Sequence, residues 1–379
     1  MLLYVTGSYP ENQEGIASGA KVLLDAMINE KNAEDFLLLT TDSPIIKRNI
    51  DKNVNCRYEL MPNWKLSLAN CRRFENILDK YDIDAIHMEY PGDLYGKTFL
   101  ASFLPYILKK YNKKHGTQIT YNVRLHEFSR ARLLRRMAII PILKCADRVY
   151  VPAQKDRESV SRYAKAEVKQ TLIGTNISVR SNEIINDEKV TIAYFGSVYP
   201  GKGIEKMLSV WKQIREYDKK DKFRYKIIGE IDTDDNNHFQ GYHKQVWKWI
   251  DEYGLKDAVI VTGYVTDEQV SYEIQHSQIA TLFYEDGLTL RRGSFLAFLA
   301  HGIPIVTSLG DAESTQLFNG YKGVAMCSDE NAVIEAIRRY SELSIIDKEE
   351  IRKDAIELSR RFNWENIAKS FLRDYGEVE

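Results

Sequence analysis

The sequence predicts an α/β protein of two domains, each built on a doubly wound parallel sheet. The first observation is the length, 379 residues, because a single hydrophobic core stops growing beyond about 250–300 residues. The second is that short apolar runs alternate with amphipathic stretches of about 10–15 residues, a pattern typical of βαβ units. The third is a polar segment without periodicity, residues 178–189, which marks a domain boundary.

The two halves differ in charge. Residues 1–180 contain 28 Lys and Arg and 20 Asp and Glu, whereas residues 181–379 contain 25 and 34. A basic half suits a polyanion, a phosphorylated substrate or an anionic membrane surface, and charge alone does not choose among them.

Composition excludes several classes of protein. No apolar run approaches the roughly 18–20 residues that span a bilayer, and the first residues do not form a signal peptide, so we expect a cytoplasmic protein. The four cysteines lack CxxC spacing, which argues against a disulfide framework or a zinc site.

In the first half, a helical pattern follows the glycines of the loop after the first strand. Buried strands are expected over residues 2–6, 36–40, 56–61, 85–89, 118–123 and 149–152, and helices over 66–80 and 98–111. Ligands of doubly wound sheets bind beyond the carboxyl ends of the strands. Three polar clusters fall there: Gly15 to Gly19, Glu89-Tyr90-Pro91, and Arg124 to Glu127.

Two of these clusters contain candidate acceptor-binding residues. Gly15 and Gly19 allow a close backbone approach to a ligand, but their spacing is not the GxGxxG fingerprint, so NAD binding is not expected. Glycines that only form the turn are the alternative. His126, with Arg124 before it and Glu127 as its orienting partner, is placed to position or protonate a substrate hydroxyl. The alternative is a structural histidine.

Residues 129–148 interleave Arg130, Arg132, Arg135 and Arg136 with apolar side chains. Such a helix can lie on an anionic membrane surface. A core helix with a solvated basic face is the alternative, and it is the preferred interpretation.

The second half repeats the alternation. Strands are expected over residues 190–195, 225–228, 259–262, 279–283 and 305–308, and helices over 204–216, 245–252, 267–275, 330–343, 348–361 and 362–375.

Residues 281–308 carry the strongest indication of an anion site. A strand leads into a loop with Glu285, Asp286, Arg291 and Arg292, and a helix then begins near Gly293 and Ser294. A helix N-terminus beside two guanidinium groups suits a phosphate or diphosphate. A second loop, Gly196 to Gly203, presents Lys202 before a helix, without P-loop spacing.

An acidic segment contains Asp232, Asp234 and Asp235 in an apparent DxD arrangement. In so polar a segment solvated carboxylates are the expected state, and no metal site is predicted.

Four features together resemble the family 4 retaining glycosyltransferases of the GT-B fold. They are the loop Gly196 to Gly203 with Lys202, the strand end Val261 to Val265 followed by two acids, the run AxxLAHGIPIVTS, and the closing FNWENIA. The resemblance implies two Rossmann-like domains facing across a cleft: 1–178 for the acceptor, 179–358 for a nucleotide-diphosphate sugar, and a last helix, 359–379, crossing back. It further implies metal-independent transfer with retention, and a lipid-linked or other glycan acceptor at the membrane face; no nucleic-acid partner is expected.

The sequence departs from the family pattern at two positions. Ser197 stands where the family has Arg, and Ala297 stands near the place of a ribose-binding Glu. We therefore expect Arg291 or Arg292 to supply the missing cation, and Glu285 or Asp286 to contact the donor sugar or ribose. The predicted donor site comprises Gly196, Ser197, Lys202, Glu285, Asp286, Arg291, Arg292, Gly293 and Ser294.

His126, Glu127 and Glu285 are the catalytic candidates, without a metal or other cofactor. A sugar-nucleotide epimerase and a non-catalytic partner subunit are the competing interpretations, and the oligomeric state is not predicted.

Overall fold

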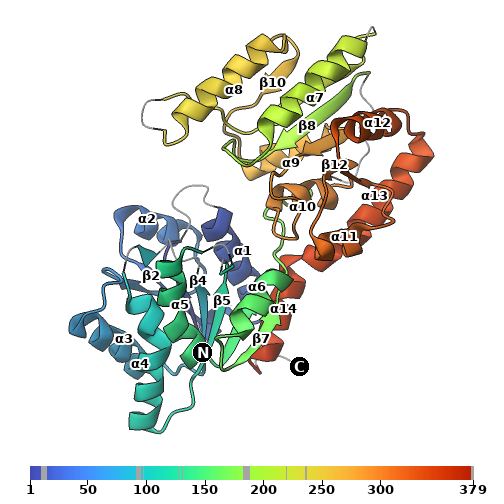
Figure 1. The fold of residues 1–379 in the computed structure, drawn as a ribbon. Helices are drawn as coiled ribbons and strands as arrows, with labels where there is room; N and C mark the ends of the chain where they lie inside the picture. Colours follow the sequence, from blue (N-terminus) through green and yellow to red (C-terminus); the bar gives the residue numbers. More distant parts are fainter. Residues whose placement is uncertain are drawn as a thin grey trace. The chain divides into compact units, whose positions relative to one another are not determined.

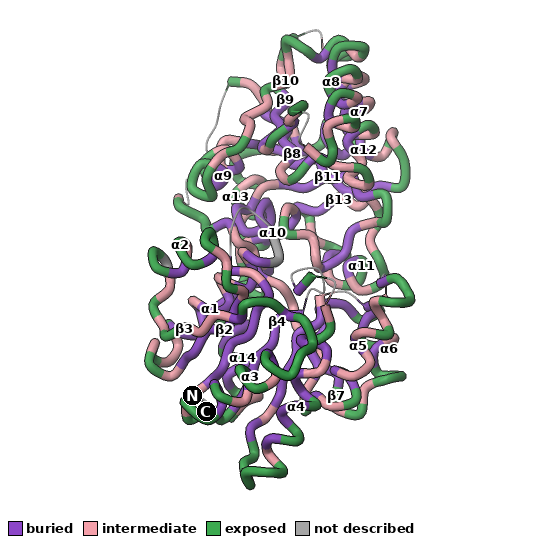
Figure 2. The backbone as a smooth tube through the Cα atoms, turned by 90° about the vertical axis from the view of Figure 1, so that its left-hand side faces the viewer, coloured by how far each residue is buried: buried purple, intermediate pink, exposed green. Residues whose placement is uncertain are grey.

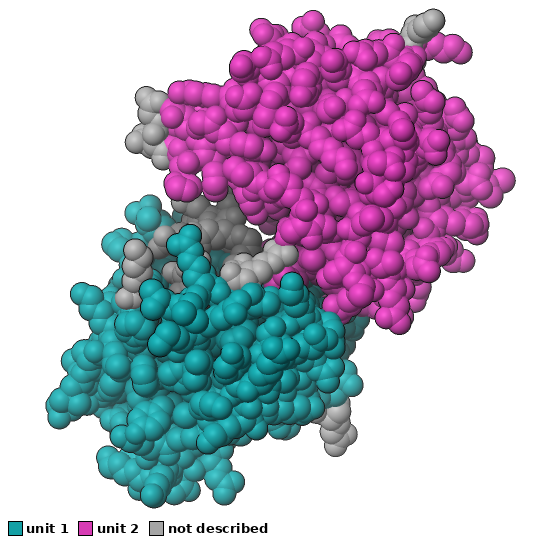
Figure 3. All heavy atoms as spheres, viewed as in Figure 1, with its two compact units in different colours: residues 1–173, 364–379 teal, residues 174–363 magenta. Residues whose placement is uncertain are grey.

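The computed structural model describes residues 1–9, 15–90, 95–96, 98–126, 128–129, 131–181, 188–218, 220–234 and 237–376. The chain forms two compact units, Met1–Ile173 with Trp364–Glu379, and Gly174–Asn363 (Figure 3). The chain thus changes unit after residues 173 and 363, whereas the boundaries predicted from the sequence fall after 178 and 358.

Unit 1 contains a seven-stranded sheet in the order β3-β2-β1-β4-β5-β6-β7 (Figure 1). Every neighbouring pair is parallel. The strands are β1 (Leu2–Thr6), β2 (Phe36–Thr41), β3 (Arg57–Met61), β4 (Ala85–Tyr90), β5 (Thr120–Leu125), β6 (Arg148–Val151) and β7 (Glu167–Gln170).

Side chains of unit 1 alternate between two hydrophobic cores, one on each face of the sheet. From β1, Leu3 and Val5 enter one core, and Leu2 and Tyr4 enter the other. Because helices cover both faces, β1 and β4 are buried along their length (Figure 2). The helices are α1 (Gly15–Glu30), α2 (Pro44–Asn53), α3 (Leu68–Lys80), α4 (Leu100–His115), α5 (Leu133–Cys145), α6 (Gln154–Ser161) and α14 (Trp364–Asp374).

The last helix, α14, belongs to unit 1. Its Phe371 and Leu372 enter the same core as Leu23 of α1. Gly19 of α1 faces this helix, and a Cβ atom there would be 3.6 Å from the Trp364 ring, an ordinary van der Waals contact. Gly19 is therefore a packing position between two helices.

Unit 2 contains a six-stranded parallel sheet in the order β10-β9-β8-β11-β12-β13. The strands are β8 (Val190–Phe195), β9 (Phe223–Ile228), β10 (Val259–Val261), β11 (Ile279–Leu282), β12 (Ile305–Ser308) and β13 (Val324–Cys327). The helices are α7 (Ile204–Tyr217), α8 (Gln240–Glu252), α9 (Asp267–Gln275), α10 (Gly293–Ala300), α11 (Ala312–Phe318), α12 (Glu330–Ser341) and α13 (Ile345–Ser359). Two doubly wound parallel sheets were predicted, and this fold class is confirmed.

Helix α5 falls in the basic and apolar segment of the sequence. Ile139 and Ile142 are buried in the core, while Leu133 and Leu134 at its start are 74% and 82% exposed. In the described residues no helix is long and apolar enough to cross a bilayer.

Candidate active site

Glycine 196 brings three elements of unit 2 together at the carboxyl end of β8. Its φ is +133°, a region that glycine occupies without steric cost. A Cβ atom on Gly196 would lie 2.7 Å from the Ser294 Oγ, and one on Gly229 would lie 2.6 Å from the Gly196 carbonyl oxygen. The start of α10 and the end of β9 therefore both contact this loop.

The Lys202 loop is joined to the loop after β11 in the same way. Gly203 has a φ of +64° at the N-cap of α7, and a side chain there would collide with the Phe283 carbonyl. The Glu285 N–H donates to the Gly201 carbonyl over 3.3 Å. The two loops that the sequence singled out are thus neighbours.

Two cations of these loops share one aromatic ring. The Arg292 guanidinium lies 4.3 Å from the centroid of Tyr284, and the Lys202 Nζ lies 5.9 Å from it. Arg292 also donates to Asp286, and its Nε is buried without a partner in the part of the chain that the structure describes. These charges lie beside the first turn of α10, whose N–H groups have no partner within the helix. The arrangement is suited to an anion.

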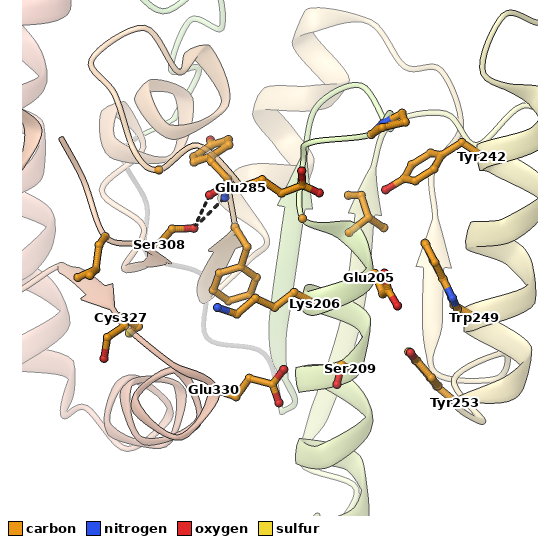
Figure 4. Close-up of a pocket in the computed structure, with 18 residues that line it drawn as sticks. Glu205, Lys206, Ser209, Tyr242, Trp249, Tyr253, Glu285, Ser308, Cys327 and Glu330 are labelled. Atoms are coloured by element: carbon orange, nitrogen blue, oxygen red, sulfur yellow. Dashed lines mark hydrogen bonds between the residues drawn. The ribbon is translucent and has the colours of Figure 1, made fainter.

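The two acids of the β11 loop have different surroundings. Asp286 pairs with Arg292, whereas Glu285 lines a cavity of about 660 Å³ that extends along α7 (Figure 4). Tyr242, Trp249 and Tyr253 border this cavity on the side of α8. Burial, followed by Glu285 and Glu205, raises the pKa of Tyr242 to about 12. Glu285 therefore faces a ligand-sized groove, while Asp286 balances the charge of Arg292.

In unit 1, a buried carboxylate lies at the carboxyl ends of β4 and β5. Glu89 is fully buried and accepts from His87 Nε2 over 2.9 Å and from Arg124 over 3.4 Å. Its other oxygen bonds to Nε2 of His126, whose side chain is 13% exposed. The Tyr4 hydroxyl donates a further hydrogen bond to Glu89 Oε1 over 3.4 Å.

The ionisation of this cluster follows from its contacts. Burial raises the pKa of Glu89, but the electrostatic interactions with Arg124 and His126 and the hydrogen bonds from both histidines outweigh it and hold that pKa well below its ordinary value. Burial also lowers the pKa of His87, against the opposing effect of Glu89. The pair Glu89 and Arg124 is therefore ionised, and His87 is neutral at neutral pH.

Part of the chain matches a known protein family. Residues 189–342 match the family described as Glycosyl transferases group 1. This match lies within unit 2. No curated protein matches the sequence of the chain.

Solved structures share the fold of this chain over nearly its whole length. A glycosyltransferase from Rickettsia africae ESF-5 is 13% identical with a TM-score of 0.73, and covers 99% of this chain and 97% of that one. HepE from Anabaena, in complex with UDP and glucose, is 13% identical with a TM-score of 0.70, covering 100% and 99%. A sucrose-phosphate synthase from Thermosynechococcus elongatus is 17% identical with a TM-score of 0.66, covering 99% and 98%.

The residues predicted to bind a donor lie around the carboxyl ends of β8 and β11. Ser197 is exposed and Arg291 half-buried, while Ala297, near the position of the family's second Glu, is fully buried in α10. An acid could not replace Ala297 without disturbing the core.

The acceptor candidates are less concentrated. His126 is partly exposed at the end of β5, but Arg124 is 1% exposed and donates to Glu89 and to the Leu172 carbonyl over 3.3 Å. Gly15 is the first residue of α1, and Gly19 faces α14. Glu127 lies outside the described residues, and Glu89 bonds to the imidazole for which Glu127 was the expected partner.

Glu89 received no role from the sequence, although a pattern pointed to it. His87 and Glu89 are two residues apart on β4, and Arg124 and His126 are two apart on or just after β5; such spacing puts each pair on one face. The register pairs Glu89 with Arg124. Because the sequence does not show that register, it presents these four polar residues as two separate pairs.

Among the described residues, no three His, Cys, Asp or Glu side chains gather into a metal-binding group. The Asp232 carboxylate accepts from the Asp234 N–H over 2.8 Å in a local turn. Asp235 lies outside the described residues.

Proposed function

We propose that this glycosyltransferase transfers a sugar from a nucleotide-diphosphate sugar, bound by unit 2, to an acceptor bound by unit 1, with retention of anomeric configuration and without a metal ion. The observation that carries the proposal is the placement of Lys202 and Arg292 on the Tyr284 ring beside the start of α10. The Anabaena neighbour, solved with UDP, supports the donor class.

The chemistry of transfer explains why cations are needed at this point. As the bond to the anomeric carbon breaks, negative charge grows on the departing diphosphate. Fixed positive groups that face that charge lower the barrier. Lys202, Arg292 and the N–H groups of α10 supply them, and the departing phosphate oxygen takes the acceptor proton.

The acceptor is a lipid-linked or other glycan, and unit 1 has a surface that fits a membrane-bound substrate. Leu133, Leu134 and Met137 are exposed on α5 at 74%, 82% and 56%, next to the exposed Arg132. Apolar side chains beside cations bind anionic lipid surfaces.

Calorimetry with UDP-, GDP-, dTDP- and ADP-sugars tests the donor site. One nucleotide class should bind, and Lys202→Ala and Arg292→Ala should each weaken it about 10- to 100-fold, the loss of one charge-assisted hydrogen bond. Unchanged affinity in Arg291→Ala and Arg292→Ala alike would remove the basis of the proposal.

Product analysis tests the reaction. Sugar on an added lipid-linked acceptor, in the donor's anomeric configuration, supports transfer with retention. Conversion of the nucleotide sugar without any acceptor would instead identify an epimerase, and donor binding without turnover on any acceptor would identify a non-catalytic subunit.

A further inference from the structure

The buried cluster around Glu89 allows only one arrangement of protons. An ionised carboxylate can only accept hydrogen bonds, so His87 must donate through Nε2 to Glu89 Oε1, 2.9 Å away. Because His87 is neutral, its Nδ1 is an acceptor, and the Tyr375 hydroxyl at 2.5 Å must donate to it. The chain of hydrogen bonds therefore runs from α14 to Glu89 with every direction fixed.

The same constraint applies to the second oxygen of Glu89. Oε2 bonds to His126 Nε2, so this nitrogen carries a hydrogen. In the neutral imidazole the other nitrogen, Nδ1, is then an acceptor. In the described part of the chain no hydrogen-bond partner of Nδ1 is observed.

His126 is also the point at which the cluster reaches the surface. Glu89, His87 and Arg124 are at most 1% exposed, whereas the His126 side chain is 13% exposed. It follows β5 directly, at the edge of the sheet where doubly wound proteins bind ligands. A buried hydrogen-bonded network with one exposed member orients that member.

We infer that Glu89 is a positioning residue of the glycosyltransferase: it holds His126 as the Nε2–H tautomer and presents Nδ1 as a hydrogen-bond acceptor for a substrate hydroxyl. Tyr375, through His87, fixes the carboxylate from α14. This inference rests on the proposed function for the identity of the hydroxyl, which belongs to a sugar, and on geometry alone for the tautomer.

The groups around Glu89 come from four elements. They are Tyr4 from β1, His87 from β4, Arg124 with His126 from the end of β5, and Tyr375 from the end of α14. Tyr95 donates to the Glu89 carbonyl over 2.7 Å and holds the backbone. Arg124 is the one guanidinium among these residues, and it balances the charge of Glu89.

The test is the tautomer of His126 in the full-length protein, read from imidazole ¹⁵N shifts after labelling with ¹⁵N-histidine. The His126 signals are those missing from the His126→Gln spectrum. At a pH where the ring is neutral, we expect a protonated Nε2 and an unprotonated Nδ1. A wild-type spectrum with Nδ1–H would overturn the inference, and this measurement needs neither donor, turnover nor a folded variant of Glu89.

Variants then separate positioning from a purely structural role. Glu89→Gln should give a mixture of tautomers and lower kcat about 10- to 100-fold with little change in donor Kd, as expected for a lost acid–base or orienting contact. Tyr375→Phe should move the His126 shifts in the same direction by a smaller amount. Tyr111→Phe, which removes a 2.8 Å bond to Asp79 in the same unit, is the matched control and should leave them unchanged.

The outcomes are distinct from a failure of the proposed function. If the tautomer is as expected but no nucleotide sugar binds, the donor proposal fails and the role of Glu89 stands. If transfer occurs and Glu89→Gln retains both kcat and the wild-type tautomer, the inference is wrong.

Discussion

Replacement of Gly196 by alanine tests the geometry of the proposed donor site most directly. The methyl group would lie 2.7 Å from the Ser294 Oγ, and the backbone φ of +133° disfavours any side chain. Backbone strain of this kind costs about 1–3 kcal/mol, and overpacking adds about 1–3 kcal/mol. The free energy of unfolding of unit 2 should therefore fall by about 2–6 kcal/mol.

The same substitution should weaken donor binding, because it displaces Ser294 and with it the first turn of α10. For a unit of this size, the predicted loss of about 2–6 kcal/mol in the free energy of unfolding corresponds to a fall in Tm of about 4–24 °C. Differential scanning calorimetry gives the stability, and titration calorimetry with the best nucleotide sugar should show at least about 10-fold weaker affinity.

Gly241→Ala is the matched control for this substitution. Gly241 is exposed in α8 and has no positive φ, and a methyl group there would meet no neighbouring side chain within 4 Å. Alanine there should be neutral or stabilise the fold by up to about 1 kcal/mol. The close approach of β8 and α10 would be contradicted if Gly196→Ala had the same Tm as the control and bound the donor with the affinity of the wild type.

Three further predictions concern stability and the membrane. Ser271→Ala should lower the free energy of unfolding in urea by about 1–3 kcal/mol, because His301 Nε2, 2.9 Å from the Ser271 hydroxyl, loses its hydrogen-bond donor. Ser277→Ala loses only a bond to a helix carbonyl and should lower the free energy of unfolding by less. Equal losses in the two variants would contradict this prediction. Burial lowers the pKa of His87, so below about pH 6.5 this histidine is protonated in the unfolded chain but not in the folded one. The free energy of unfolding should therefore fall from pH 7 to pH 5.5, and it should fall less steeply in His87→Gln. A rise over this pH range would contradict the assignment. Leu134→Glu should lower binding to anionic vesicles about 10-fold or more in a flotation assay. Leu68→Glu on α3, where the leucine is also exposed, should leave vesicle binding unchanged. Equal binding by both variants would exclude α5 as the membrane contact.

The sequence predicted the fold where periodicity is strong. The helix expected over 267–275 is observed with those bounds because Thr266 and Gln269 form a capping box. The elements omitted from the prediction, α2, α6, α11, β7 and β13, are short or lie at the edge of a sheet. Segments of four to ten residues carry too few apolar positions for a period to be recognised.

The candidate site was predictable only in part. Glycines before helices and the tandem Arg marked the donor loops, because these residue types have local reasons to be there. The contact between Glu89 and His126 depends on the register of β4 against β5, and the pairing of Arg292 with Asp286 depends on a loop conformation. Neither can be read from spacing along one strand.

The position of α14 has a consequence for how the protein is made. Residues 364–376 leave the ribosome after all of unit 2, yet they supply Phe371 and Leu372 to a core whose other members were synthesised first. Unit 2 can fold during translation, whereas the face of unit 1 around Tyr4 and Leu23 stays exposed until the last helix arrives. Nascent chains arrested before Trp364 are therefore the form most open to proteolysis and aggregation, and a circular permutant that begins with α14 would remove that delay.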